Sequence, residues 1–188
     1  MNIRRLSALY CLLVSMALAP FVAVNADTAK PASTIPPPLA IGTVAPDFTV
    51  QDPSGAPVHL SDYKGKVVVI DFWATWCGPC QAAMPHTNEI AKEFKGQNVV
   101  FLGISIDDTK EAFDGWLPKH KDYDAMSFLR DPSERKNNIA KTLYSTYFIP
   151  TQYVIDPAGK IAYCVGYGSP TSDLEVGIKN ALKATPSS

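Results

Sequence analysis

The sequence predicts a three-layer α/β domain, in which helices pack on both faces of a central sheet. Two continuous apolar stretches, Val67 to Phe72 and Val99 to Ile106, have the composition of strands buried on both faces. Predicted strands and helices alternate along the chain, and two strands joined by a tight turn come near its end. This alternation with a closing hairpin is typical of a three-layer α/β fold.

The first predicted element of the domain is a hairpin. Its short alternating strands, 48–50 and 58–60, flank the turn residues Asp52 to Gly55. A second turn, Ser61 to Lys66, leads into the first buried strand. The later elements are helix 81–95, strand 99–106, helix 109–120, strand 125–129, helix 133–144, strands 151–155 and 161–165 around the turn 156–159, and a closing helix 171–184 with Thr171 or Ser172 as N-cap.

The N-terminus has the pattern of an export signal. Arg4 and Arg5 precede an apolar run from Leu6 to Ala19, and small residues end at Ala26. A basic start, a short apolar core and a small-residue exit predict a secretory signal peptide that is cleaved near Ala26. The segment up to Val24 is also about long enough to remain as an uncleaved membrane anchor. In both cases we expect the rest of the chain to lie outside the cytoplasm, for example in the periplasm.

The chain therefore divides into three predicted regions. Residues 1–26 are the signal peptide or membrane anchor, 27–44 a proline-rich linker, and 45–188 the globular domain. Pro31 and Pro36 to Pro38 make the linker a stiff, extended tether. In a membrane-anchored form, this linker would tether the domain to the membrane.

Composition limits the classes of partner. The chain has 188 residues, 46% of them hydrophobic, and a formal net charge of -1. This is enough apolar material for one well-packed domain with additional segments. The near-zero charge gives no electrostatic reason to expect nucleic acid as a partner.

The stretch Trp76-Cys77-Gly78-Pro79-Cys80 follows the first buried strand and opens the next helix. In α/β sheets this is the usual position of a functional site. Residues three apart on a helix share one face and lie close enough for a disulfide. A thiolate at Cys77 would face the positive end of the helix dipole, and only a thiolate attacks a disulfide. We therefore expect Cys77 to be the nucleophile and Cys80 to resolve the mixed disulfide.

Two other uses of this cysteine pair stay open. A zinc site usually needs four ligands, and His59, His86 and His120 show no spacing that repeats a ligand pair. A purely structural disulfide across so short a loop would constrain the unfolded chain little. We expect redox chemistry, with no metal and with the Cys77–Cys80 disulfide as the only redox group.

Asp71 is the single acid within the buried stretch from Val67 to Phe72. Burial of an unpaired carboxylate is costly and raises its pKa. We expect Asp71 to accept the proton of Cys80 when that thiol must ionise. The alternative is an acid on an exposed face of the strand, or one that is held by a backbone donor.

Three further residues have less specific expectations. Cys164 is expected to be a small buried hydrophobic residue, His86 a polar residue on a helix surface, and Trp116 a core residue.

The segment Asp71 to Cys80 (DFWATWCGPC) and the later Ile149-Pro150-Thr151 resemble the thioredoxin superfamily. The resemblance runs from Ala45 to Ala184. It implies a thioredoxin-like fold, with Asp71 as a buried proton carrier and Ile149-Pro150-Thr151 as a cis-proline loop that faces the disulfide. In that loop the Ile149 backbone would bind an extended substrate. The implied substrate-binding residues are Trp76, Gly78, Pro79, Ile149, Pro150 and Gly166.

Two additions resemble the TlpA/ResA branch of exported thioredoxin-like reductases. One is the N-terminal hairpin, and the other is a helix-strand-helix insertion between Asp107 and Pro150. Many members of this branch have an uncharged residue where Asp71 stands. The lysine that neighbours this acid in many thioredoxins is replaced here, with Gly103 near its position. Peroxiredoxins share the opening Ala-Pro-Asp-Phe, but their Thr-x-x-Cys turn differs from Thr75-Trp76-Cys77.

The resemblance implies an exported thiol:disulfide oxidoreductase that mainly reduces protein disulfides. Its Gly-Pro dipeptide between the cysteines resembles that of reducing members. The implied partners are disulfide-containing proteins, apocytochrome c during cytochrome c maturation among them, and a membrane thiol transporter as electron donor. The alternatives are a peroxiredoxin-type thiol peroxidase and a non-catalytic thioredoxin-like binding module.

Overall fold

The computed structural model describes residues 36–133, 135–166 and 172–184. The chain divides into two compact units, Met1–Thr34 and Ile35–Ser188, and the described residues belong to the second. The signal peptide or anchor at 1–26, the first part of the linker and Thr171 lie outside the described residues, so the predicted region boundaries stay predictions. Among the helices that the structure describes, none is both long and apolar enough to cross a membrane.

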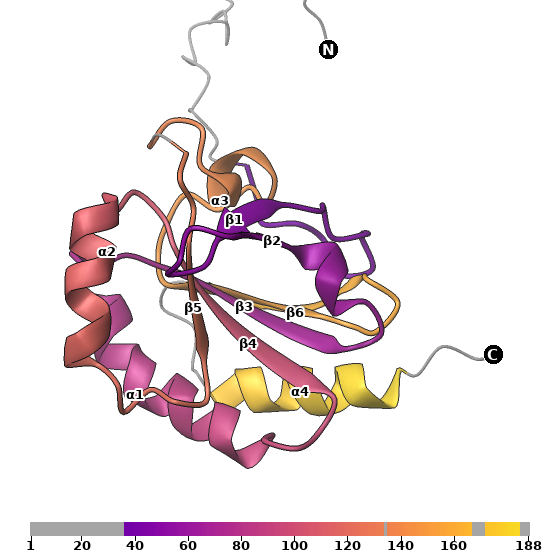
Figure 1. The fold of residues 1–188 in the computed structure, drawn as a ribbon. Coiled ribbons are helices and arrows are strands. Elements are labelled where there is room, and N and C mark those ends of the chain that lie inside the picture. Colours follow the sequence, from indigo (N-terminus) through magenta and orange to yellow (C-terminus); the bar gives the residue numbers. More distant parts are fainter. Residues whose placement is uncertain (1–35, 134, 167–171, 185–188) are drawn as a thin grey trace, which may run out of the picture. The chain divides into compact units, whose positions relative to one another are not determined.

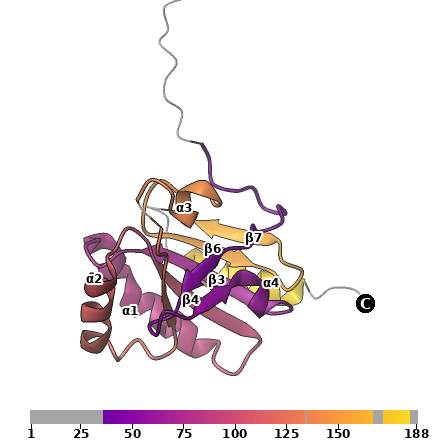
Figure 2. The same ribbon diagram turned by 45° about the horizontal axis from the view of Figure 1, so that its top comes forward.

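A mixed sheet of seven strands forms the centre of the second unit, in the order β2-β1-β5-β4-β3-β6-β7 (Figure 1). β3 (Val67–Trp73) is buried along its whole length. It pairs in parallel with β4 (Val99–Ser105) and antiparallel with β6 (Thr151–Ile155). The remaining strands are β1 (Thr49–Gln51), β2 (Pro57–His59), β5 (Ser127–Arg130) and β7 (Ile161–Val165). The predicted central strand is confirmed, as are the hairpins β1–β2 and β6–β7. The strands β6 and β7 lie side by side in Figure 2.

Helices lie on both faces of this sheet (Figure 1). One face packs against α1 (Gly78–Glu93), α2 (Lys110–Trp116) and α4 (Ser172–Lys183) through a cluster that includes Met84, Trp116 and Ile178. The opposite face packs against α3 (Ile139–Thr142) and the short 3₁₀ helix η1 (Leu60–Tyr63). A second 3₁₀ helix, η2 (Leu117–Lys119), continues α2. The predicted three-layer arrangement is confirmed.

The insertion before Pro150 consists of α2, β5 and α3, so the predicted helix-strand-helix order is confirmed. The predicted extent of its last helix, 133–144, is wrong, because α3 has only 4 residues. The Asp131 carboxylate accepts hydrogen bonds from the backbone N–H groups of Ser133, at 2.8 Å, and Ile139, at 2.7 Å. Asn138 then caps α3 through the Lys141 N–H. The bonds at Ile139 and Lys141 occupy backbone donors that a helix over 133–144 would have used internally, whereas the Ser133 N–H would lack an intrahelical partner in either case.

Gly103 of β4 lies directly beside Asp71 of β3 in the parallel pair. A Cβ atom at this position would lie 2.9 Å from Cδ1 of Phe128 and 3.4 Å from Nε1 of Trp73. The packing of β5 therefore leaves no room for a side chain where many thioredoxins carry a lysine.

Replacement of Gly103 by alanine should lower the free energy of unfolding by about 1–3 kcal/mol, because the new methyl group overpacks the core. Gly115→Ala in α2 is the matched control, since a Cβ there meets nothing within 4 Å. It should stabilise the helix by up to about 1 kcal/mol. Urea unfolding followed by circular dichroism measures both changes. Equal free energies of unfolding for Gly103→Ala and the unmodified protein would contradict this prediction, because the core around Phe128 would then accommodate the methyl group.

Candidate active site

The cysteine pair forms a disulfide at the start of α1. Cys77 and Cys80 are bonded, with their Cα atoms 5.3 Å apart. Cys77 is the N-cap of α1, and its Sγ accepts a hydrogen bond from the backbone N–H of Cys80 at 3.2 Å. Both cysteines are buried, whereas Gly78 and Pro79 between them are exposed. After reduction, the same N–H group and the positive end of the helix dipole would stabilise a Cys77 thiolate.

The loop between β3 and α1 is held by the residue Asp108. The Asp108 carboxylate accepts hydrogen bonds from the Thr75 N–H at 2.8 Å, from the Thr75 hydroxyl at 2.7 Å, and from the Ser105 hydroxyl. The Gln81 side chain in turn donates to the Thr75 carbonyl. No local sequence motif indicates this role for Asp108. Its signal is its place just after β4, since neighbouring parallel strands end at the same edge of a sheet.

The loop before β6 faces the disulfide. The Ile149–Pro150 peptide bond is cis, so the geometry that the resemblance implied is confirmed. The carbonyl oxygen of Ile149 lies 3.9 Å from the Sγ of Cys77. Gly166 directly follows β7, whose Val165 pairs with Gln152 of β6. Gly166 therefore lies at the same end of the sheet as the cis-proline loop.

Asp71 is buried on the face of the sheet that packs against α1. Its side chain is 3% exposed, and its Oδ2 accepts a hydrogen bond from Nε2 of Gln152 at 3.0 Å. The same amide donates to the Thr87 hydroxyl of α1 at 3.0 Å. Burial raises the Asp71 pKa to about 7, and the bond from Gln152 partly offsets this increase. The alternative of an exposed or backbone-held acid is wrong, because the acid is buried and its donor is a side-chain amide.

Two acceptor atoms of this buried group are unpaired. Among the described residues, Oδ1 of Asp71 and Oε1 of Gln152 have no hydrogen-bond partner. A proton on Asp71 would add a hydrogen-bond donor to a group that now has two unpaired acceptors. The raised pKa and the unpaired oxygens therefore both favour a carboxyl group that holds a proton near neutral pH.

The structure also shows the positions of Trp116, His86 and Cys164, for which the sequence-based expectations are less specific. Trp116 is buried, as expected, and its ring centroid lies 4.4 Å from that of Trp73. His86 is exposed on α1, also as expected. Cys164 is a free thiol that is only half-buried, and burial raises its pKa. Within the described ranges, no group of three or more His, Cys, Asp or Glu side chains is placed to hold a metal ion.

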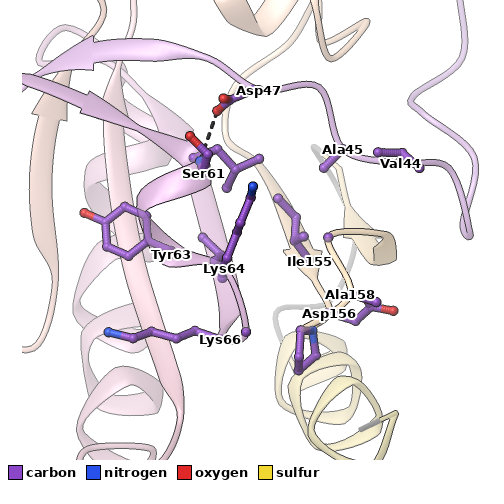
Figure 3. Close-up of a pocket in the computed structure, with 15 residues that line it drawn as sticks. Val44, Ala45, Asp47, Ser61, Tyr63, Lys64, Lys66, Ile155, Asp156 and Ala158 are labelled. Carbon is purple, nitrogen blue, oxygen red and sulfur yellow. Dashed lines mark hydrogen bonds between the residues drawn. The ribbon is translucent and has the colours of Figure 1, made fainter. Parts of the chain in front are cut away.

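A pocket of about 460 Å³ lies at the opposite end of the sheet from the disulfide (Figure 3). Its walls include Val68, at the start of β3, and Ile155, at the end of β6. Tyr63, Lys64 and Lys66 line one side of it (Figure 3). Since β3 runs from this pocket towards Trp73 and the disulfide, the redox group is separated from the pocket by the length of the strand.

Residues 41–164 match the model of the AhpC/TSA family. Curated relatives include two proteins named thiol-disulfide oxidoreductase ResA. That of Bacillus thuringiensis subsp. konkukian is 36% identical over 125 residues, which are 65% of this chain and 68% of the relative. That of Oceanobacillus iheyensis is 36% identical over 146 residues, which are 76% of this chain and 72% of the relative.

The chain also resembles solved structures of a thiol:disulfide interchange protein and of a thioredoxin. A protein from Chlorobium tepidum described as a thiol:disulfide interchange protein DsbE has a TM-score of 0.65 and 30% identity, with coverage of 77% of this chain and 99% of that one. The exposed lipoprotein thioredoxin of Streptococcus pneumoniae has a TM-score of 0.59 and 34% identity, with coverage of 73% and 98%. The chain therefore belongs to the AhpC/TSA family, and within it to the thioredoxin-like thiol-disulfide oxidoreductases.

Proposed function

We propose that this protein is an exported oxidoreductase that mainly reduces disulfide bonds in other proteins. The observation that carries the proposal is the Cys77–Cys80 disulfide at the start of α1, with the carbonyl of Ile149 3.9 Å from the Sγ of Cys77. A substrate segment could cross this point in an extended conformation. Its backbone would bind to Ile149 beside Pro150, in the way that a peptide adds to the edge of a sheet.

The reaction begins with the reduced, dithiol form of the pair. The Cys77 thiolate attacks one sulfur of a substrate disulfide, which forms a mixed disulfide and releases the other substrate sulfur as a thiolate. The Cys80 thiolate then attacks the Sγ of Cys77 and releases the second substrate thiolate. The two protons from Cys77 and Cys80 pass to the two released substrate thiolates, which thereby become thiols. Two electrons have then moved to the substrate, and the pair is left as the observed disulfide.

The exposed residues beside the disulfide are of types that suit the binding of a protein substrate. Trp76 offers an exposed aromatic surface directly before the nucleophile. Gly78 and Pro79 are exposed between the cysteines, so a partner backbone can approach the disulfide closely. We assign substrate binding to these residues, to Ile149 and Pro150, and to Gly166 at the end of β7.

Asp71 is the proton acceptor in this proposal. A carboxyl group with a pKa of about 7 can both take up and release a proton near neutral pH, as a general base must. It would take the proton of the Cys80 thiol as that thiol ionises to resolve the mixed disulfide.

The proposed location is outside the cytoplasm. It is supported by the signal-like pattern of residues 1–26 and by a structural relative that is described as an exposed lipoprotein. In an oxidising compartment the dithiol form needs continuous reduction. We propose a membrane thiol transporter as the electron donor and disulfide-containing proteins, apocytochrome c among them, as substrates.

A Cys80→Ala variant tests the proposal, because its mixed disulfide cannot be resolved and the substrate stays attached. We expect covalent adducts at Cys77 that are released by dithiothreitol and are separated by non-reducing electrophoresis. The control is the Cys77→Ala/Cys80→Ala double variant, which should retain nothing. If the single variant also retains nothing, the proposal fails. Turnover of hydrogen peroxide that depends on Cys77, without disulfide reduction, would instead favour the peroxiredoxin-type alternative.

A further inference from the structure

Exposed aromatic side chains border the disulfide. Trp76 is 56% exposed and directly precedes Cys77, and Phe148 is 59% exposed and directly precedes Ile149. Tyr147, beside Phe148, is 43% exposed. Large apolar side chains that gather at an exposed site commonly mark a surface for a protein partner. A polypeptide bound at Cys77 would therefore contact exposed aromatic side chains.

The insertion adds a cation to this border. The Cζ of Arg135, from the loop before α3, lies 5.7 Å from the centre of the Trp76 ring. Its side chain is 74% exposed. A guanidinium group over the face of a tryptophan is attracted by the ring and leaves its N–H groups free to bind at the edge. Arg135 is thus held against the residue that precedes the nucleophile.

The charge of Arg135 is only partly neutralised. Its Nε lies 3.4 Å from Oδ2 of Asp107, and the Nζ of Lys141 lies 3.8 Å from the same oxygen. One carboxylate therefore faces two cations, and one positive charge remains. The ion pair with Asp107 is formed at Nε. The terminal nitrogens of Arg135 can bind a further carboxylate with two parallel hydrogen bonds.

Two further carboxylates of this edge within the described residues, Asp108 and Asp131, point into the protein. Asp108 is 8% exposed and accepts bonds from Thr75 and Ser105, and Asp131 is 1% exposed and accepts bonds from the backbone of Ser133 and Ile139. The described residues that border the disulfide itself carry no formal charge: Trp76, Gly78, Pro79, Phe148 and Ile149. Among the residues that the structure describes, the exposed charge that lies against Trp76 is therefore the positive charge of Arg135.

We propose that Arg135 and Trp76 form a substrate subsite that prefers disulfides whose attacked cysteine is flanked by Asp or Glu in an extended segment. This inference rests on the proposed function and specifies its substrate class. In an extended segment, neighbouring residues are about 3.3 Å apart. A side chain one or two residues from the attacked cysteine is therefore close enough to reach the ring of Trp76 and the guanidinium of Arg135 above it.

The test uses the full chain and three disulfide-bonded peptides that differ only in the residues beside one cysteine, which are Glu, Gln or Lys. We expect kcat/KM to be about 3- to 10-fold higher for the Glu peptide than for the Gln peptide, mainly through KM, and lowest for the Lys peptide. The preference should shrink as salt is raised, because the subsite is exposed.

Arg135→Gln should abolish the preference, so that the Glu, Gln and Lys peptides are reduced with similar kcat/KM. Arg135→Lys should restore part of it, since the charge returns without the paired donors. Lys141→Gln is the matched control: it removes one cation from Asp107 but none from Trp76, so the preference should persist. Equal reduction of the three peptides, or an undiminished preference in Arg135→Gln, would overturn the subsite and leave the proposed function intact. Failure to reduce any of them would overturn both.

Discussion

A Cys77→Ser variant should lose disulfide reduction by about 10³-fold or more, because a serine hydroxyl does not ionise near neutral pH and cannot attack a disulfide sulfur. The fold should survive the change, since a disulfide across so short a loop contributes little to stability. Insulin reduction in the presence of dithiothreitol, corrected for the uncatalysed rate, measures the loss. Circular dichroism confirms that the variant is folded.

Two other variants separate the roles of the thiols. Cys80→Ser should still release one thiolate from an aromatic disulfide in a single burst, because Cys77 can attack once, but it should not turn over. Cys164→Ser should reduce insulin at the rate of the unmodified protein, since the half-buried Cys164 is not part of the disulfide. If Cys77→Ser kept its activity and Cys164→Ser lost it, the nucleophile would be assigned to the wrong cysteine.

An Asp71→Asn variant should be more stable than the unmodified protein at pH 8. The pKa of Asp71 is about 7 in the folded protein, against an ordinary value of 3.8. Between these two pH values the folded state binds one more proton than the unfolded state. The free energy of unfolding therefore falls as pH rises from about 4 to about 7 and stays at this lowered value at higher pH, where Asp71 is ionised in both states. At 1.36 kcal/mol per pKa unit, the loss is on the order of 4 kcal/mol.

The asparagine removes this loss, because it is neutral at every pH. Urea unfolding from pH 4 to pH 8 should thus show a flatter profile for Asp71→Asn. Gln152→Leu is the companion variant: it removes the bond that lowers the Asp71 pKa, so the fall in stability should extend to higher pH.

The catalytic role of Asp71 has its own measurement. If Asp71 accepts the Cys80 proton, the resolving step in Asp71→Asn should slow and lose its pH dependence near neutrality. An unchanged rate and pH profile would contradict that role and leave the stability argument standing.

The strands were predictable because their signal is local. The apolar runs at β3 and β4 and the turn between β6 and β7 depend only on neighbouring residues, and the bounds of β6 and β7 agree with the prediction. The helix predicted at 133–144 failed for a different reason. Its first half has suitable residues, but the Asp131 carboxylate folds back and accepts the Ile139 N–H, which a helix over 133–144 would have bonded internally. Helical periodicity does not show such side-chain competition.

Some residues of the candidate site could likewise be predicted from the local sequence, and others could not. The cysteine pair and Asp71 lie within one short segment and could be found by inspection. Asp108 is 33 positions from Thr75, with which it forms hydrogen bonds, and only the parallel pairing of β3 and β4 brings the two together. Arg135 reaches Trp76 from the insertion, and no local pattern indicates that contact. The cis form of the Ile149–Pro150 bond came from the resemblance, since residue types alone do not give the isomer.

The close contact between Gly103 and Phe128 links the charge environment of Asp71 to the packing of the core. A lysine at position 103 would lie beside Asp71, but the Phe128 ring occupies the space that its side chain would need. The pKa of the buried acid is therefore raised by burial and lowered by the bond from Gln152, without a countercharge from position 103. A lineage that acquired a lysine there would first have to accept a smaller residue at position 128, so acid strength and core volume can change only together.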